Sequence, residues 1–270
     1  MKRCLLIALL IGGCHRTPPA WPADLTADLT RIELRRGPRL AQLQRAPDGM
    51  WMATAPHHGE GDLRAINALL GTLQHPQLTS AARGAGEGEV ATSIVLEGKA
   101  GRHTVEVMAV PLGRPVPLVV DGRARFLGSP VELSTKIPDP DDMVANGLWM
   151  SAEHLDTLLT VTGPLKYSVR RTGPESFESS IPAHPGVDLE DFVGAITGRQ
   201  IIAFPPAGPP SQFGLDAPVC TAELCAGATC RTFRFGQHTD NGVRRAYAQA
   251  PGVDVAEIRS EVLALLLRGP

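Results

Sequence analysis

The sequence predicts an α+β protein built from two tandem copies of one strand, helix and hairpin unit, with mainly antiparallel sheets and helices packed on one face. Three observations support this prediction. Short segments in which apolar and polar residues alternate recur along the chain, as in half-buried strands. Two longer segments, which start at Asp62 and Asp188, carry apolar residues at helical spacing. Residues 43–70 also match residues 169–196 without a gap, and self-similarity at a fixed spacing indicates a repeated structural unit.

The repeat depends on a pattern of residue types rather than on high identity. Each copy reads as a strand, a bulky aromatic residue, a turn marked by Pro, an Asp at a helix start and an amphipathic helix. We therefore expect a first unit over residues 25–137 and a second unit over residues 138–270. The matched pairs are Arg45 with Arg171, Trp51 with Phe177, Pro56 with Pro182, His58 with His184, Asp62 with Asp188 and Leu63 with Leu189.

The composition is that of an ordinary globular protein. Of the 270 residues, 43% are hydrophobic and 20% are charged, which excludes a disordered chain, and the length suffices for two small domains. Aromatic residues make up only 4%, so the core must consist mostly of Leu, Val, Ile and Ala. The net charge of −2 and the absence of a long basic run argue against nucleic-acid binding.

The first residues have the features of a bacterial secretory signal. Lys2 and Arg3 precede a short apolar run, residues 5–11, and small residues follow it. The segment Leu10-Ile11-Gly12-Gly13-Cys14 resembles the bacterial lipobox, in which cleavage before the Cys leaves a thiol that carries diacylglycerol. We expect a signal peptide at residues 1–13, lipidation at Cys14 and a lipidated tether at residues 14–24. A plain signal peptide with an incidental Cys is the alternative.

In the first unit, turn residues separate the expected strands. A helix is expected from Asp62 to about Gln74, with Leu63, Ile66, Leu69, Leu70 and Leu73 on its buried face. Asp121-Gly122 is typical of a type I′ hairpin turn, because both residues accept positive φ. The expected strands cover residues 30–34, 40–45, 50–53, 92–96 and 104–110 and the two arms of 118–126.

The second unit repeats this plan after a hinge at residues 138–142. A short helix capped by Ser151 is expected to include Leu155, Leu158 and Leu159, and a second helix runs from Asp188 to about Gly198. A terminal helix is expected from Asp254. The expected strands cover residues 165–171, 176–181, 219–225, 229–235 and 245–249.

Three cysteines fall in the predicted hairpin of the second unit. Alternation places Cys220 toward the core, but Cys225 and Cys230 toward solvent and opposite each other. We therefore expect a Cys225–Cys230 disulfide, while Cys220 remains a reduced apolar thiol. The spacing of the cysteines also suggests a metal site, but a fourth ligand at a suitable spacing is absent.

The densest group of potential ligands lies just before the first long helix. His57, His58 and Glu60 could bind zinc, but their spacing does not make them converge, so they are weak candidates. Asp62 is expected to cap the helix instead. The sequence contains no recognised nucleophile or phosphate-binding motif. We therefore predict no catalytic residues, no metal and no cofactor.

Several segments together resemble the bacterial domain-of-unknown-function family 4340. They are Trp51, Pro56 and Asp62 in the first unit, and in the second Phe213-Gly214-Leu215-Asp216-x-Pro218, Phe235-Gly236, Tyr247-Ala248 and Val255-x-x-Ile258. This resemblance covers most of the chain and implies a protein encoded beside ABC transporters of the gliding-motility type. It transfers no catalytic residues. Relatives in that family carry an N-terminal membrane helix, whereas here lipid would supply the anchor.

These observations lead to a functional expectation. We expect a lipid-anchored cell-envelope protein with a binding or assembly role, whose partner is an ABC transporter component or an envelope polymer. Its place would be the outer membrane, because His15 rather than Asp follows Cys14, with the domain in the periplasm or at the cell surface. The alternative is a hydrolase of envelope glycan or peptide. A pocket with clustered carboxylates of shifted pKa would favour the hydrolase.

Overall fold

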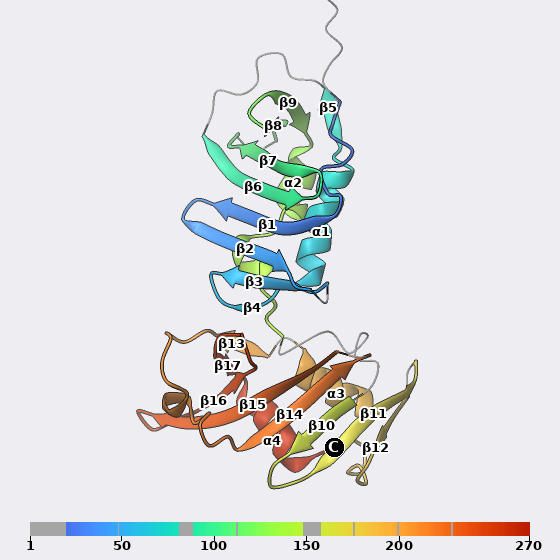
Figure 1. Ribbon diagram of the computed structural model, residues 1–270, viewed down its shortest axis with the longest axis vertical. Helices are drawn as coiled ribbons and strands as arrows, with labels where there is room; N and C mark the ends of the chain where they lie inside the picture. Colours follow the sequence, from blue (N-terminus) through green and yellow to red (C-terminus); the bar gives the residue numbers. More distant parts are fainter. Residues whose placement is uncertain are drawn as a thin grey trace, which may run out of the picture.

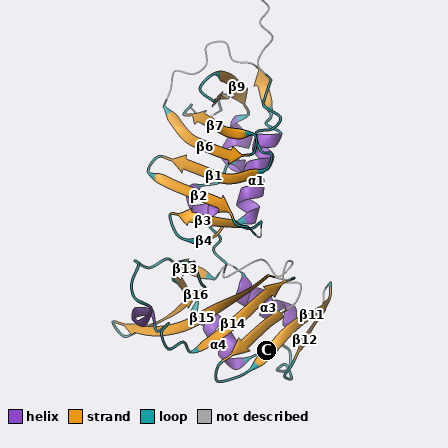
Figure 2. Cartoon of the chain, viewed as in Figure 1, coloured by secondary structure: helices purple, strands orange, loops and turns teal. Residues whose placement is uncertain are grey.

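The described chain forms two antiparallel sheets, which follow each other along the long axis of the molecule (Figures 1 and 2). Each sheet has helices on one face. A computed structural model describes residues 20–47, 49–80, 89–111, 113–147, 158–174, 176–198, 200–227 and 229–270. The predicted signal peptide, Cys14 and Ser151 lie outside these residues. The predicted α+β class with mainly antiparallel sheets is confirmed.

The first sheet has nine described strands in the order β4-β3-β2-β1-β6-β7-β8-β9-β5. Helices α1 (Leu63–Gln74) and α2 (Pro130–Lys136) pack together on one face, and a 3-10 helix, η1 (Pro140–Met143), follows them. The strands are β1 (Leu29–Arg36), β2 (Arg39–Arg45), β3 (Trp51–Ala55), β4 (Gly59–Glu60), β5 (Leu78–Ser80), β6 (Val90–Gly98), β7 (Gly101–Met108), β8 (Val116–Val120) and β9 (Ala124–Gly128).

The second sheet has eight described strands in the order β12-β11-β10-β14-β15-β16-β17-β13. Helices α3 (Leu189–Thr197) and α4 (Ser260–Arg268) contact each other on its face, and a 3-10 helix, η3 (Pro210–Phe213), precedes β14. The strands are β10 (Leu158–Thr162), β11 (Tyr167–Gly173), β12 (Ser176–Ser179), β13 (Ile201–Ala203), β14 (Cys220–Ala226), β15 (Thr229–Asp240), β16 (Val243–Gln249) and β17 (Ala256–Ile258).

The order in which the chain places its strands in the first sheet corresponds to the order in the second sheet. In each sheet a three-strand meander is placed beside a four-strand meander, and a short strand that follows the first long helix closes the far edge. The first described strand of each unit, β1 or β10, belongs to the three-strand meander and pairs with the first strand of the four-strand meander, β6 or β14. The described part of the first sheet has one further strand, β4, at its end.

Each sheet and its helices enclose a separate core of mostly aliphatic side chains. The amphipathic helices pack on the sheets because their apolar residues occupy one stripe, which is Ile66, Leu69 and Leu73 in α1. Leu63 was expected in this stripe but is 45% exposed. It lies on the same margin of the helix as the half-buried Leu70, two turns further on, and at the helix end this margin is open to solvent.

The boundary between the units lies later than predicted. Residues 138–144 belong to the first unit, because the Asp139 carboxylate binds Arg36 and Arg39, at 3.4 and 2.9 Å, and Met143 is fully buried in the first core. The expected hinge is therefore a packed segment. Two apolar side chains join the units: Phe204 packs against both cores, and Met50 of the first unit packs against the second.

Parts of two segments predicted as helical are strands, and Leu155 of the first segment lies outside the described residues. Leu158 and Leu159 lie in β10, between β11 and β14, where the β-branched residues of this run suit a sheet. The terminal helix starts at Ser260 rather than Asp254, because Ala256 and Ile258 are both buried at the period of a strand. This strand, β17, pairs with β16 on one side and with β13 on the other.

Candidate functional site

The residues that the sequence marked as weak metal ligands lie at the junction between the two units. The Glu60 carboxylate, on β4, accepts a hydrogen bond from the Arg231 guanidinium, on β15. Their side chains are only 11% and 17% exposed. A second Arg231 nitrogen contacts Met52 Sδ at 3.4 Å. Glu60 therefore serves as one half of a largely buried ion pair that joins the units.

The two histidines each contact the second unit in a different way. The His57 ring stacks on Phe204, with the ring centroids 4.4 Å apart. The His58 backbone N–H donates to Asp254 Oδ2 at 2.9 Å, and the Asp254 N–H donates back to the His58 carbonyl at 2.7 Å. His57, His58 and Glu60 thus have separate partners, and within the described part of the chain they do not form a group of converging metal ligands.

A small cavity lies within the same junction. It holds about 30 Å³ and is lined from both units, by Glu60 and Ala145 on one side and by Phe204, Arg231 and Asp254 on the other. This space suits about two water molecules, which is far less than a sugar or peptide requires. The cavity is therefore a feature of the packed junction rather than a cleft for such a substrate.

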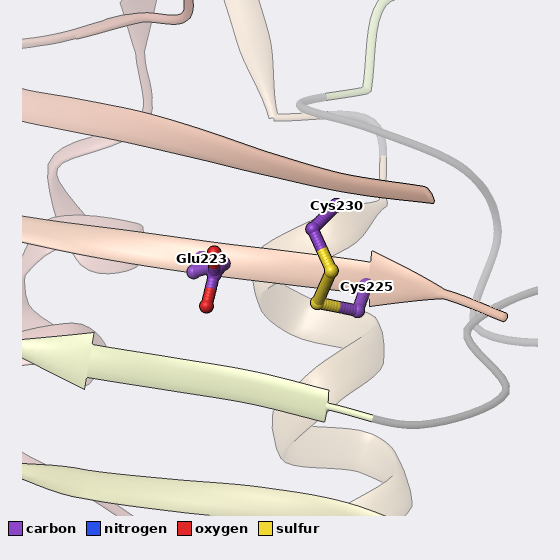
Figure 3. Close-up of side chains that lie close together, drawn as sticks. All are labelled: Glu223, Cys225 and Cys230. Carbon is purple, nitrogen blue, oxygen red and sulfur yellow. A yellow bond between two sulfur atoms is a disulfide. The ribbon is translucent and has the colours of Figure 1, made fainter. Parts of the chain in front are cut away.

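The hairpin of β14 and β15 carries the predicted disulfide. Cys225 and Cys230 are directly opposite in the register, and their sulfur atoms are bonded at 2.06 Å (Figure 3). Cys220 pairs with Phe235, is 2% exposed and is free, as expected. Burial raises the pKa of the Cys220 thiol to about 11, so this thiol stays protonated and unreactive at neutral pH.

Only one of the two bridged cysteines points to solvent as predicted. Cys230 is exposed, but Cys225 is 7% exposed. The reason lies in the sheet: β10 flanks β14 at Cys225, whereas β16 begins to pair with β15 only at Arg234 and leaves Cys230 at an open edge. Cys230 is thus the more exposed of the two bridged residues.

The segment Phe213–Pro218 is a packing element on the other face of the second sheet. Phe213, Leu215 and Tyr247 form a small buried cluster, with the two rings 5.1 Å apart. Gly214 adopts a φ of +68°, and a Cβ there would lie 2.5 Å from the Gln237 carbonyl oxygen. A Cβ at Gly236 would collide with the Phe213 carbonyl oxygen. Both glycines therefore allow the two backbones to approach each other closely.

Trp21 fixes the start of the described chain to the first unit. Its indole N–H donates to the Leu73 carbonyl at 2.8 Å, at the end of α1, and its ring packs edge-on against Phe126 of β9. The predicted tether at residues 14–24 is thus attached from Trp21 onward. This attachment lies at the end of the molecule remote from the second unit (Figure 1).

Sequence reasoning did not identify Arg231 or Asp254 as residues of the junction. The sequence contained one indication that Arg231 has a partner. Arg231 lies two residues before Phe233 and so takes a core-facing position in its strand. A charge at such a position needs a partner, but the local pattern does not say which. The partner, Glu60, lies in the other unit.

No described helix is both long and apolar enough to cross a membrane. Searches with the chain against protein-family models, curated proteins and solved structures return no match.

Proposed function

We propose that this chain is a lipid-anchored protein of the bacterial cell envelope with a binding or assembly role. The observation that carries the proposal is the Leu10–Cys14 segment, in which small residues precede a Cys after a short apolar run. Lipid on Cys14 would hold the protein at the outer membrane, with the domain in the periplasm or at the cell surface. Several acyl chains on one residue give stable anchoring.

The attachment of Trp21 to the first unit supports a role in which the anchored first unit holds the second unit away from the membrane, toward a partner. The stretch from Cys14 to Trp21 spans at most about 25 Å when extended, so the near end of the first unit would stay close to the membrane. The second unit lies at the other end of the long axis (Figure 1). It would face away from the bilayer, where it can meet a partner.

The resemblance to family 4340 makes a component of an ABC transporter the first partner we propose, and an envelope polymer the second. A rigid particle suits either role. The Glu60–Arg231 pair and the ring stack of His57 on Phe204 support this rigidity. The hydrolase alternative gains no support from the junction cavity, because a volume of about 30 Å³ cannot hold its substrate.

The repeat is also part of this proposal: the two units are tandem copies of one structural unit. The corresponding order of strands in the two sheets supports it. Asp62 and Asp188 cap corresponding helices, α1 and α3. Arg45 covers Trp51 and Arg171 covers Phe177, with guanidinium-to-ring distances of 5.9 and 5.5 Å, and in each pair the two residues are opposite one another in the sheet.

The anchor is tested by labelling cells with a fatty-acid analogue. Cys14→Ser should abolish incorporation and move the protein from the membrane fraction to the soluble periplasmic fraction. Cys4→Ser is the matched control, since Cys4 lies in the same leader, and should leave labelling unchanged. Equal incorporation into the Cys14→Ser variant would overturn the proposal.

The partner is tested with a photo-crosslinking residue at exposed positions in both units. We expect an adduct from the second unit, for example at Val243, and none from Arg102 of the first. The adduct should be lost in the Cys14→Ser variant. Mass analysis then distinguishes a transporter component from an envelope polymer. Adducts from the first unit alone would contradict the proposed orientation.

A further inference from the structure

We propose that the β14–β15 hairpin, once its disulfide is reduced, binds one Zn²⁺ ion through Glu223, Cys225 and Cys230. Each residue offers one ligand atom, and these three atoms lie within 4.8 Å of one another. Figure 3 shows the Glu223 side chain beside the bridge. This inference does not depend on the proposed anchor or partner.

The register of the hairpin places the three ligands on one face. Glu223 and Cys225 are two residues apart on β14, so their side chains project from the same face of the strand. Cys230 is directly opposite Cys225 on β15. The fourth corner of this patch is the exposed Thr232, which is opposite Glu223. Three protein ligands with an open fourth position for water match the number of protein ligands that zinc has in catalytic sites.

The chemistry of the donors selects the ion. Two thiolates and one carboxylate suit Zn²⁺, whereas Mg²⁺ and Ca²⁺ require oxygen ligands throughout. Glu223 pairs through its backbone with β10 and β15, but among the described residues its carboxylate has neither a hydrogen-bond partner nor an ion-pair partner and is available. Cys220 takes no part, because it faces the core on the opposite side of β14.

Reduction opens the site by thiol–disulfide exchange with a dithiol. One thiolate of the dithiol attacks the sulfur of the more exposed Cys230, and Cys225 leaves as a thiolate that takes up a proton. The second thiol of the dithiol then attacks its own sulfur in the mixed disulfide and releases Cys230 as a thiol. Two electrons and two protons pass to the hairpin, and the dithiol becomes a disulfide. Zn²⁺ then displaces both thiol protons.

Zinc and the bridge therefore compete for the same two sulfur atoms. Zn²⁺ can bind only the reduced hairpin, because the bridge occupies both sulfur atoms in the oxidised form. Bound Zn²⁺ therefore stabilises the reduced hairpin by mass action. Zinc should accordingly shift the dithiol–disulfide equilibrium of the hairpin toward the reduced form.

Co²⁺, which reports thiolate ligation by its absorption, tests the site. The full chain is reduced with a phosphine, separated from it without oxygen and titrated with Co²⁺. We expect one equivalent to produce a thiolate-to-cobalt charge-transfer band and tetrahedral visible bands, which one equivalent of Zn²⁺ then abolishes. The oxidised chain should show neither.

Three variants identify the ligands. Glu223→Gln should weaken Zn²⁺ binding by about tenfold or more. Cys225→Ser combined with Cys230→Ser should abolish the charge-transfer band, and the control Cys220→Ala should leave it unchanged. Circular dichroism follows folding, and Zn²⁺ should raise the melting temperature of the reduced chain but not of the oxidised chain.

The proposal is overturned if the reduced chain gives no charge-transfer band, or if Glu223→Gln binds Zn²⁺ as tightly as the unaltered chain. It is also overturned if reduction unfolds the hairpin and Zn²⁺ does not restore the folded signal. Loss of the band in Cys220→Ala would show that Cys220 is a ligand, and this result would also overturn the proposal.

Discussion

The buried position of Cys220 raises the pKa of its thiol. It faces Phe235 in the second core, and burial raises its pKa from the ordinary 9.0 to about 11. Burial also raises the pKa of Tyr167, with a further contribution from Cys220. Both groups bind their protons more tightly in the folded chain than in the unfolded chain.

Because the folded chain binds these protons more tightly, the free energy of unfolding decreases as the pH rises in the alkaline range. The contribution of Cys220 is complete below pH 9.0 and is lost as the pH rises through about 11. We expect the free energy of unfolding to fall by at most about 1.4 kcal/mol per pH unit for this one proton. Urea denaturation between pH 8 and 10.5 measures it. Cys220→Ala should flatten this decline, although it lowers stability at every pH. An equal decline in both chains would disprove the role of Cys220.

Among the elements, helices α1 and α3 both begin with an Asp side chain that caps the first turn. Asp62 accepts the Ala65 N–H at 3.0 Å, and Asp188 accepts the N–H groups of Glu190 and Asp191 at 2.8 and 3.3 Å. Each carboxylate satisfies donors that have no partner within the helix.

Removal of either cap should therefore cost a similar amount. We expect Asp62→Ala and Asp188→Ala each to lower the free energy of unfolding by about 1 kcal/mol, with Asn at either position close to the unaltered chain. Thermal denaturation provides the measurement. Asp191→Ala is a control, since Asp191 lies in the first turn of α3 but its side chain does not cap the helix. A cost confined to one helix would show that the two caps are not equivalent.

The disulfide fixes only a short loop, between residues five apart in the sequence. Because a short loop has little entropy to lose, Cys225→Ser combined with Cys230→Ser should cost at most about 2 kcal/mol. The cost is measured by urea denaturation of the oxidised chain and the double variant. A larger loss would indicate that the bridge also supports packing around the buried Cys225.

Alternation identified most strands because each sheet buries one face, as in β14, where Cys220, Ala222 and Leu224 all face the core. It failed where elements are short. Ala256–Ile258 is too brief to establish a period of two, and its apolar residues also fit the start of a helix. The weak metal candidates were interpreted from local spacing alone, although contacts with the distant Arg231 and Asp254 decide their surroundings.

At the scale of the whole molecule, the Glu60–Arg231 pair is an ion pair between the units. Both side chains are mostly buried, so removing one partner takes this ion-pair contact away from a carboxylate or guanidinium that water solvates poorly. Water reaches the pair in part, and we therefore expect Arg231→Met to cost about 2 kcal/mol rather than the full penalty of a buried site.

The same change should weaken the coupling between the two cores. Calorimetry is expected to show one transition for the unaltered chain and a broader or divided transition for Arg231→Met, as the units begin to unfold separately. Arg234→Met is the matched control, because Arg234 lies on the same strand but is exposed and bonds only to Gln249 among its described contacts. A single sharp transition in Arg231→Met would mean that apolar contacts alone couple the units.

The edge strands of the two sheets affect whether neighbouring copies of the protein can associate by strand addition. The four edge strands, β4, β5, β12 and β13, have two, three, four and three residues. A strand this short presents few unpaired backbone groups, and β4 also faces the second unit (Figure 1). Strand addition from a neighbouring molecule, the first step toward fibrils, thus finds little template at the described edges of either sheet. We therefore expect copies that are concentrated on a surface not to polymerise through these edges.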